Sequence, residues 1–354
     1  MAWSDVKLTP FKEIIKRQPP AIPGEPFHMQ PYSNDLPKLV GNPWYGAYSK
    51  HGFWYKFRYA KKMDYDYIAA RSVESKNNFL LYASYDLCIN NGTTYLIAEN
   101  QRNEIIGCVS KTVADGQLIL GSYYVDENYR HSGIGLSLIK EVMNDATQRY
   151  VFHSPSHLSN KVYEKIGLRP LGNDWAFQRV ILFKAENVVQ QTSPDIKSGK
   201  DVICTQSARH LFSFDSHICG YNREEYLKSL IKHDSVQSAV HYDTNNEVIG
   251  FCVAIEVERQ EAKQIWVGPW YAADSITAEN LLRHILGLFE DYTEVHILLP
   301  KRNAEALPIV SKLADKKGKF EIERIYFQTC ASDGSMAGDT SKVFGTGDLN
   351  SQLL

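Results

Sequence analysis

The stretch YYVDENYRHSGIGLSLIKEVM, residues 123–143, carries the strongest structural signal in this chain. An apolar run ends at Val125, two glycines follow closely, and apolar residues then recur at helical spacing, at Ile134, Leu138 and Val142. The pattern predicts a strand, a tight turn and a helix. The N-terminus of a helix leaves backbone N–H groups unpaired and carries positive partial charge, so such a turn binds phosphate where no side chain blocks the approach.

The spacing of the turn residues narrows the choice of phosphate-binding motif. Gly133 and Gly135 keep the approach open and Arg130 adds a cation, in the order Arg-x-x-Gly-x-Gly. A dinucleotide fingerprint needs Gly-x-Gly-x-x-Gly at the end of a parallel strand, and no third glycine stands at that spacing. A Walker loop needs Gly-Lys-Ser/Thr, which the turn also lacks. Neither of these nucleotide-binding motifs fits.

Predicted strands and helices alternate on both sides of the turn. Asn-Gly at 91–92 and Asp-Gly at 115–116 are strong hairpin signals between apolar runs. The expected elements of this half are a helix around 65–86, strands at 93–100, 104–113 and 117–125, the helix after the turn, a strand at 150–154, a helix at 156–167 and a closing strand at 175–183.

These residues resemble the GNAT superfamily of acyl-CoA-dependent N-acyltransferases, whose signature Gln/Arg-x-x-Gly-x-Gly/Ala lies between the fourth strand and the next helix. VDENYRHSGIG fits that signature. In the family the turn holds the pyrophosphate of coenzyme A, the strand edge beside it pairs with the pantetheine arm, and a backbone N–H at the strand end polarises the thioester carbonyl. The resemblance therefore implies a cofactor site made of Val125, Arg130, Ser132, Gly133, Ile134 and Gly135.

A second family motif stands at the expected distance. Tyr163 and Gly167 match the Tyr-x-x-x-Gly end of the family's next helix, where the tyrosine can protonate the departing thiolate. The resemblance thus implies Tyr163 as the general acid, and a packing role is the alternative. The asparagine usually found seven residues earlier, which bonds the pantetheine arm, is Ser156 here. That contact is carried over to Ser156 as a cofactor-binding expectation.

The rest of the chain repeats the same order of elements. A helix at 222–233, strands at 235–243, 247–258 and 264–272, a helix at 276–292, a strand at 294–300, a helix at 303–318 and a strand at 320–330 are expected. This half has no Arg-x-x-Gly-x-Gly, and Asp274 puts negative charge where a pyrophosphate would lie. The stretches FDSHICGYNREEYLKSLI (214–231) and VGPWYAAD (267–274) resemble the divergent C-terminal GNAT-like domain of tandem proteins that are numerous in nematodes. In such proteins we expect the second domain to cover, shape or complete the first domain's substrate site.

The predicted fold class is α/β (α+β), with two tandem GNAT-like domains, each a mixed, mostly antiparallel sheet flanked by helices. The predicted boundaries are an extended N-terminal arm at 1–45, a GNAT domain at 46–187, a linker at 188–201, a divergent GNAT-like domain at 202–331 and a disordered tail at 332–354.

Composition argues against nucleic-acid binding, a cysteine-based metal or redox site and a membrane span, although a local basic patch stays open. The formal net charge of -2 over 354 residues gives no overall basic field for nucleic acid. The six cysteines include no CxxC pair, so neither a zinc knuckle nor a redox pair is indicated. No export signal or apolar stretch of about 20 residues is apparent. We expect a cytoplasmic protein that acts without metal, nucleic acid or membrane.

The general base is the weakest point of the sequence argument, because the strand before the turn contains no carboxylate. His153 ends the next strand and can accept a proton directly or through water, whereas Glu104 precedes an earlier strand. A core or surface histidine is the plainer interpretation of His153. His153 and His157 have metal-like spacing, but Pro155 interrupts the helix between them and no third ligand is apparent.

The sequence therefore predicts an acetyl- or acyl-CoA-dependent N-acetyltransferase that transfers an acyl group directly to a primary amine of a small molecule. Two alternatives stay open. One is the same chemistry on a protein lysine or N-terminus, and the other is a noncatalytic coenzyme A sensor or scaffold.

Overall fold

The computed structural model describes residues 41–74, 89, 92–143, 149–155, 164–171, 176–183, 195–203, 208–259, 262–314, 320–331 and 338–347. The predicted N-terminal arm lies outside these residues except for its last five. By their contacts, residues 39–354 group into one unit. We call residues 41–183 the first half and residues 195–347 the second half.

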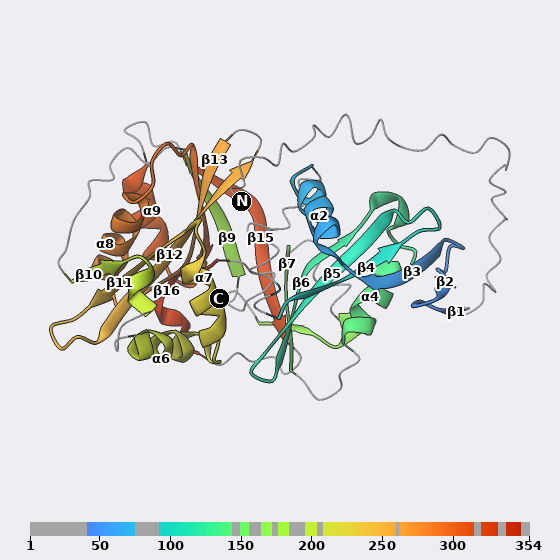
Figure 1. Ribbon diagram of the computed structural model, residues 1–354, viewed down its shortest axis with the longest axis horizontal. Helices are drawn as coiled ribbons and strands as arrows, with labels where there is room; N and C mark the ends of the chain where they lie inside the picture. Colours follow the sequence, from blue (N-terminus) through green and yellow to red (C-terminus); the bar gives the residue numbers. More distant parts are fainter. Residues whose placement is uncertain are drawn as a thin grey trace. The chain divides into compact units, whose positions relative to one another are not determined.

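The first half is a run of antiparallel strands followed by one parallel neighbour (Figure 1). The Asp115-Gly116 hairpin forms as expected, with both residues at positive φ, 46° and 72°. β6 then pairs in parallel with β7. The strands are β1 (Gly41–Asn42), β2 (Gly46–Tyr48), β3 (Trp54–Tyr59), β4 (Thr94–Glu99), β5 (Ile105–Ala114), β6 (Gln117–Val125), β7 (Arg149–Pro155), β8 (Arg169–Pro170) and β9 (Ala176–Phe183).

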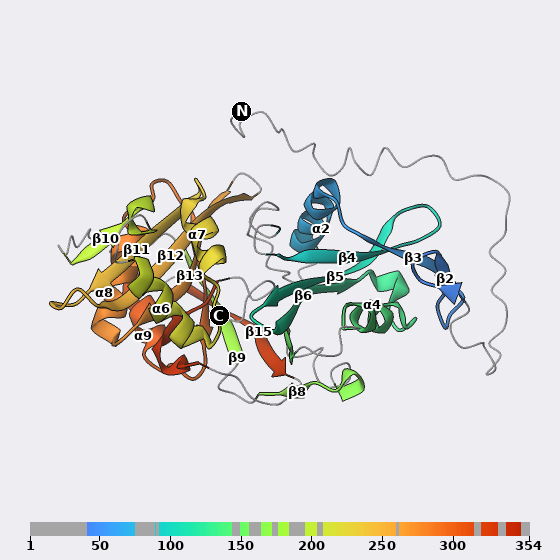
Figure 2. The ribbon, with the colours of Figure 1, turned by 60° about the horizontal axis from the view of Figure 1, so that its bottom comes forward.

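Two helices cover opposite faces of these strands. Figure 2 shows α2 (Lys62–Glu74) and α4 (Ile134–Val142) on either side. Alternation along β4 explains this, because Leu96 packs with α4 and Ile97 with α2. Short 3-10 turns stand at Glu127–Tyr129 (η2) and Glu164–Ile166 (η3). The predicted helix at 156–167 falls on undescribed residues up to 163, as does the end of the helix expected around 65–86.

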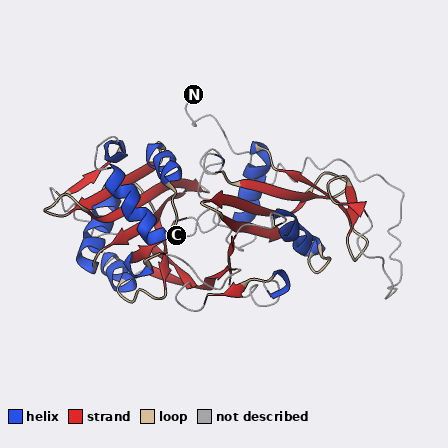
Figure 3. Ribbon diagram, turned by 90° about the horizontal axis from the view of Figure 1, so that it is seen from below, coloured by secondary structure: helices blue, strands red, loops and turns tan. Residues whose placement is uncertain are grey.

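The second half contains every element that its sequence predicts. Figure 3 shows the helices in blue beside the strands in red. β13 and β14 are parallel, as β6 and β7 are in the first half. An additional helix, α6, precedes the predicted one. The elements are α6 (Ala208–Cys219), α7 (Glu224–Lys232), β11 (Val236–Tyr242), β12 (Val248–Arg259), β13 (Ala262–Ala272), α8 (Ser275–Leu286), β14 (Glu294–Pro300), α9 (Ala306–Leu313) and β15 (Phe320–Ala331).

The two halves correspond residue by residue at the strand before the turn. GSYYV at 121–125 of β6 matches GPWYA at 268–272 of β13. In both strands a register shift interrupts pairing with the preceding strand at this point. Tyr123 packs on the α4 side and Trp270 on the α8 side, where its indole N–H donates to the Ala278 carbonyl at 3.0 Å. The two halves therefore agree even in which face of the sheet each of these side chains occupies.

The last strand of each half pairs with the other half. The predicted closing strand of the first half is present as β9, and its neighbours are β14 and β15. β15 in turn pairs with β7, for example Thr329 with His153. The sheet path is therefore β3-β4-β5-β6-β7-β15-β9-β14-β13-β12-β11. A hydrophobic strand pattern specifies which face is buried but not which backbone edge it joins, so no pattern in the sequence predicts this exchange.

Two segments expected to be irregular are partly ordered. The predicted linker contains β10 (Ile196–Ser198), which pairs with β11, and a 3-10 turn η5 (Lys200–Ile203). The predicted disordered tail is wrong for residues 338–347, which include η6 (Thr340–Lys342) and β16 (Val343–Gly345). Val343 and Phe344 are only 1% and 3% exposed. Small polar composition suggested disorder, but two buried side chains and strand pairing suffice to order a short segment.

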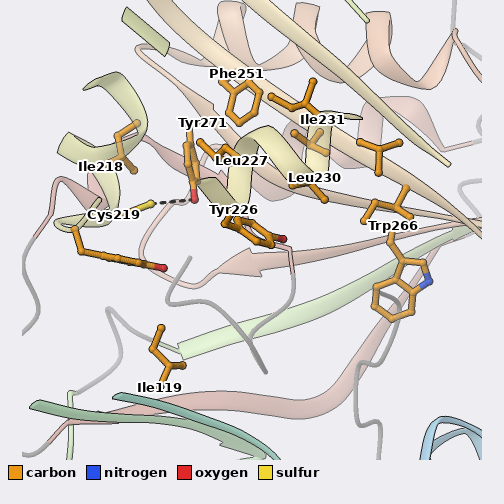
Figure 4. Close-up of a cluster of buried hydrophobic side chains, with 14 of the residues drawn as sticks. Ile119, Ile218, Cys219, Tyr226, Leu227, Leu230, Ile231, Phe251, Trp266 and Tyr271 are labelled. Carbon is orange, nitrogen blue, oxygen red and sulfur yellow. Dashed lines mark hydrogen bonds between the residues drawn. The ribbon is translucent and has the colours of Figure 1, made fainter. Parts of the chain in front are cut away.

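A buried ion pair joins α6, α7 and β13 within the core. Asp215 and Arg223 form two hydrogen bonds, at 2.7 and 2.9 Å, and Arg223 also donates to the Tyr271 hydroxyl at 2.9 Å. Figure 4 shows Tyr271 and its contact with Cys219 among the surrounding apolar side chains. Burial lowers the pKa of Arg223, but its interactions with Asp215, Cys219 and Tyr271 together outweigh this effect, so the pKa lies well above its usual value.

We expect Asp215→Asn to destabilise the protein by about 3 to 5 kcal/mol, because it leaves a buried guanidinium without its counter-charge. The measurement is urea unfolding followed by circular dichroism. Asp234→Asn is the control, since Asp234 pairs with Lys200 at an exposed position, and it should leave the midpoint unchanged. Equal effects of the two variants would contradict a structural role for the buried pair.

Candidate functional site

β6 carries a bulge just before the turn. Tyr124 pairs with Cys108 and Gly121 with Ser110, so Ser122 and Tyr123 together face one residue of β5. Ser122 has φ 44°, in the left-handed region. An extra residue bends a strand and increases its local twist. The end of β6 is therefore redirected relative to the neighbouring strands.

The ladder between β6 and β7 ends just before this bulge. Their parallel ladder runs from Gln117–Arg149 to Leu120–Phe152, although β6 continues to Val125 and β7 to Pro155. The rest of β7 pairs on its other edge with β15. The last residues of β6 thus have an edge that lies beyond the β6–β7 ladder.

The backbone of Val125 points to that edge. The N–H of Asp126 donates to the Ile106 carbonyl on β5 at 2.9 Å. Successive residues of a strand direct their backbone groups to alternate edges, so the N–H and C=O of Val125 point away from β5. The Val125 carbonyl accepts from Arg130 Nε at 3.1 Å, which agrees with this direction. The Val125 N–H faces the same side and can donate to a ligand there.

The turn is held by its own side chains. Asp126 accepts from the N–H of Asn128 and caps η2. Ser132 is fully buried, and its hydroxyl donates to the Tyr129 carbonyl at 2.5 Å and accepts from the N–H of Ile134 at 3.4 Å. The hydroxyl of Ser132 therefore stabilises the turn, and only its backbone is available to a ligand.

The two glycines have different physical roles. Gly133 caps α4 with φ 93°, a conformation that side chains rarely adopt, and a Cβ there would meet only Lys50 Cγ, at 4.0 Å. A Cβ on Gly135 would collide with the Tyr123 hydroxyl and approach Val125 Cγ2 to 2.9 Å. Gly133 thus keeps the outer approach to the helix open, whereas Gly135 lets α4 pack on β6.

The start of α4 supplies donors for an anion. The backbone N–H of Ser137 donates to the Gly133 carbonyl at 3.0 Å, and this bond closes the first helical turn. The N–H groups of Gly135 and Leu136 precede that bond and point out of the helix end. Arg130 is 40% exposed beside them and makes a long contact of 3.5 Å with Glu127. Donors, partial helix charge and a cation thus converge on the outer side of the turn.

Tyr123 stands behind this site as a neutral phenol. Burial raises the pKa of Tyr123 to about 12, and the nearby positive charge of Arg130 opposes the rise. Its ring packs edge-on against Phe152, with centroids 6.0 Å apart. Tyr123 therefore stays protonated at neutral pH and serves as packing between β6, β7 and α4.

The sequence-predicted site residues divide into two sets. Val125, Arg130, Ser132, Gly133, Ile134 and Gly135 lie together in one turn. Tyr163 and Ser156 lie outside the described residues, and only the backbone of His153 is described, in β7 opposite Thr329. The catalytic assignments of Tyr163 and His153 therefore stay predictions.

Sequence reasoning missed Lys50. It lies in the β2–β3 hairpin, where its N–H donates to the Ser132 carbonyl at 3.1 Å and its side chain passes Gly133. Ser49 holds this hairpin by accepting from the N–H of Phe53 at 3.1 Å. Lys50 adds a second cation to the turn, and no sequence signal links residues separated by more than 80 positions.

Comparison with known proteins identifies the family. Residues 91–169 and residues 211–338 each match a family model described as an acetyltransferase (GNAT) domain. The first match covers the turn just described. The chain belongs to the GNAT superfamily as a tandem protein.

One protein is similar to this tandem GNAT chain in sequence, and two solved structures are similar to it in fold. An uncharacterized protein of Caenorhabditis elegans is 21% identical over 209 residues, which span 58% of this chain and 66% of that relative's length. A putative acetyltransferase from Pyrococcus horikoshii has the same fold, with a TM-score of 0.60 at 15% identity over 84% of this chain and 95% of that one. A tandem GNAT protein from the clavulanic acid biosynthesis pathway has a TM-score of 0.53 at 9% identity over 80% and 99%.

Metal clusters and membrane-spanning helices are both absent from the described residues. Within the part of the chain that the structure describes, no group of three or more His, Cys, Asp or Glu side chains is placed to hold a metal ion. Among the same residues, no helix combines the length and apolar character needed to span a bilayer.

Gly135→Ala tests the contact between α4 and β6. Helix propensity alone favours alanine by about 1 kcal/mol, but the clash with Tyr123 should reverse the sign and cost about 1 to 3 kcal/mol in urea unfolding. The same substitution in a Tyr123→Phe background should cost less, because the colliding hydroxyl is gone. Stabilisation by Gly135→Ala alone would show that the two elements do not approach this closely.

Proposed function

We propose that the first half is the working domain of an acyl-CoA-dependent N-acyltransferase that acylates a primary amine of a small molecule. The observation that carries the proposal is that two sets of backbone N–H donors, at the end of β6 and at the start of α4, lie close together along the chain. The N–H of Val125 faces the edge of β6 that lies beyond the β6–β7 ladder. The N-terminus of α4, which carries no capping side chain, lies a few residues further along the chain.

The residues of the turn fit the pyrophosphate of coenzyme A. Gly133 leaves its outer side open, so an anion can approach the N–H groups of the first turn of α4. Arg130 lies in the turn and the side chain of Lys50 passes Gly133, so both residues add positive charge near the turn. The fit rests on donors and charge that are already in place, and acetyl-CoA is the acyl donor we propose to test first.

The chain's own groups have separate tasks in this proposal. Acyl-CoA, when bound, supplies a thioester carbonyl and a thiol leaving group. The Val125 N–H donates to that carbonyl and polarises it, in the manner of an oxyanion donor. Tyr163 protonates the departing sulfur, as the resemblance implies. The bent end of β6 would orient the thioester, because its backbone would pair with the pantetheine arm.

We do not choose the carboxylates of β4 or of the turn before β5 as the proton acceptor for the amine. Glu99 is almost fully buried and bonds to Arg58 at 2.6 Å, with Lys56 at 3.5 Å. Glu104, just before β5, accepts from the Asn100 side chain at 2.6 Å. Because these carboxylates are already bonded, His153 or a water chain is the base that we propose.

Gly133→Asp should weaken the affinity for acetyl-CoA by at least about tenfold, because a carboxylate at the helix N-terminus repels a phosphate. The measurement is isothermal titration calorimetry. Gly116→Asp is the matched control, since Gly116 also has positive φ (72°) and open space around it, but lies in the distant β5–β6 hairpin. It should bind normally. Equal affinities for wild type and Gly133→Asp would refute the site.

Release of free thiol with a panel of amines then tests the reaction. Turnover with small primary amines, and its loss in Tyr163→Phe, is the expected result. Turnover only with lysine peptides or protein N-termini would favour the protein-modifying alternative. Tight binding of acetyl-CoA without turnover on any amine would favour the sensor alternative.

Lys50→Gln should weaken acetyl-CoA binding a few-fold and make the affinity less dependent on salt, because one exposed cation near the phosphates is removed. Titrations at two ionic strengths measure both effects. Lys228→Gln on α7 removes an exposed lysine from the second half, paired with Glu224 and Glu225, and should change neither quantity. Identical salt dependence in all three proteins would exclude Lys50 from the site.

A further inference from the structure

We infer that the second half does not take up acyl-CoA, because the chain's own C-terminal segment, residues 338–347, fills the place where a pantetheine arm would lie. This goes beyond the proposed function, which concerns the first half. Three observations carry it: the strand pairing of β16, the packing of its side chains and the acidic cap at the N-terminus of α8.

β16 occupies the gap between the two parallel strands of the second half. The β13–β14 ladder ends at Val267–Ile297, just as the β6–β7 ladder ends at Leu120–Phe152. β16 then pairs with β13, Gly345 opposite Trp270 and Val343 opposite Tyr271. On the other side, the N–H of Thr346 donates to the Leu298 carbonyl of β14 at 3.0 Å.

The strand edge taken by β16 is the counterpart of the open edge in the first half. Trp270 and Tyr271 correspond to Tyr123 and Tyr124 in the GPWYA and GSYYV repeats. β12 already pairs with the opposite edge of β13 at Trp270 and Tyr271. The backbone donors and acceptors that a pantetheine arm would use are therefore bonded within the chain.

Side chains of the segment lock it in place. Phe344 packs against Trp270 with ring centroids 5.5 Å apart, and both are buried. Asn303 donates to the Val343 carbonyl at 2.9 Å, and Arg302 donates to the Thr340 hydroxyl at 2.6 Å. The segment thus bonds to β13, to β14 and to the loop after β14.

The surrounding backbone is shaped to receive the segment. A Cβ on Gly268 would collide with the backbone of Thr346 and Gly347. A Cβ on Gly345 would come within 3.0 Å of Ile297 and 3.1 Å of Trp270. Glycine on each side allows an approach that side chains would prevent. The GNAT family match ends at residue 338, so this segment adds to the matched domain.

The phosphate position of the second half is also blocked. Asp274 caps α8, and its carboxylate accepts from the N–H of Thr277 at 2.8 Å. An acidic cap occupies a helix donor and repels a phosphate, whereas Gly133 caps α4 without a side chain. Both parts of a coenzyme A site are thus unavailable in this half.

Hydrogen exchange of the full chain tests the inference directly. We expect the amides of 343–346 to be protected and to stay protected when acetyl-CoA saturates the protein. Exchange at the rate of an unfolded peptide, or loss of protection on adding acetyl-CoA, would overturn the inference. Neither result depends on whether the first half binds acetyl-CoA.

Variants of the segment supply a second test. Phe344→Asp should lower the Tm by about 5 °C or more, and Phe344→Leu by less than half as much, because leucine keeps most of the apolar contact. A synthetic peptide of residues 338–348 should restore the Tm of a chain shortened to end at residue 336. Unchanged Tm in both Phe344→Asp and the shortened chain would overturn the inference.

Binding stoichiometry separates this inference from the proposed function. One acetyl-CoA per full chain, lost in Gly133→Asp, supports both. Two acetyl-CoA per full chain, one of which still binds in Gly133→Asp, would place the second in the other half and overturn the inference. If no acetyl-CoA binds at all, the proposed function fails, and the protection of residues 343–346 alone decides the inference.

Discussion

The separation of two parallel strands opens a strand edge in each half of this protein. β6 and β7 share four residue pairs and then part, as β13 and β14 do. A strand that leaves its neighbour exposes backbone N–H and C=O groups, and these need a partner wherever they are shielded from water. The fold therefore builds the same requirement twice.

The two halves meet that requirement differently. In the first, Arg130 bonds the Val125 carbonyl and the N–H of Val125 faces the edge where we propose that acyl-CoA pairs. In the second, β16 supplies a strand from the same chain. The helix N-termini also differ between the halves. Gly133 caps α4 without a side chain, whereas Asp274 caps α8 with a carboxylate. One half is arranged to accept a ligand, whereas the other is completed internally.

Exchange of the last strands explains why the halves form one unit. β15 pairs with β7 of the first half and β9 pairs with β14 of the second, so each sheet continues into the other. Sheet edges that would otherwise be exposed are paired. β15 also runs beside the strand that bears His153, which gives the second half a direct structural contribution next to the proposed catalytic residues.

Much of this architecture follows from the sequence by itself. The Arg-x-x-Gly-x-Gly turn, the hairpin at Asp115-Gly116 and the repeated order of strands and helices predict the family and the cofactor turn, because glycine positions and apolar periodicity are local properties. The acidic residue at the second helix start, Asp274, is equally evident from the sequence. These signals need no knowledge of which segments meet in space.

Tertiary structure alone decided the pairing partners of the closing strands. Backbone hydrogen bonds are the same for every residue type, so the strand patterns at β9 and β15 do not reveal which edge each strand joins. Lys50 reaches the turn only because the β2–β3 hairpin packs there, and Ser132 turns inward only because Tyr129 offers a carbonyl. The order of the segment at 343–346 depends on a gap between strands that exists only in the folded chain.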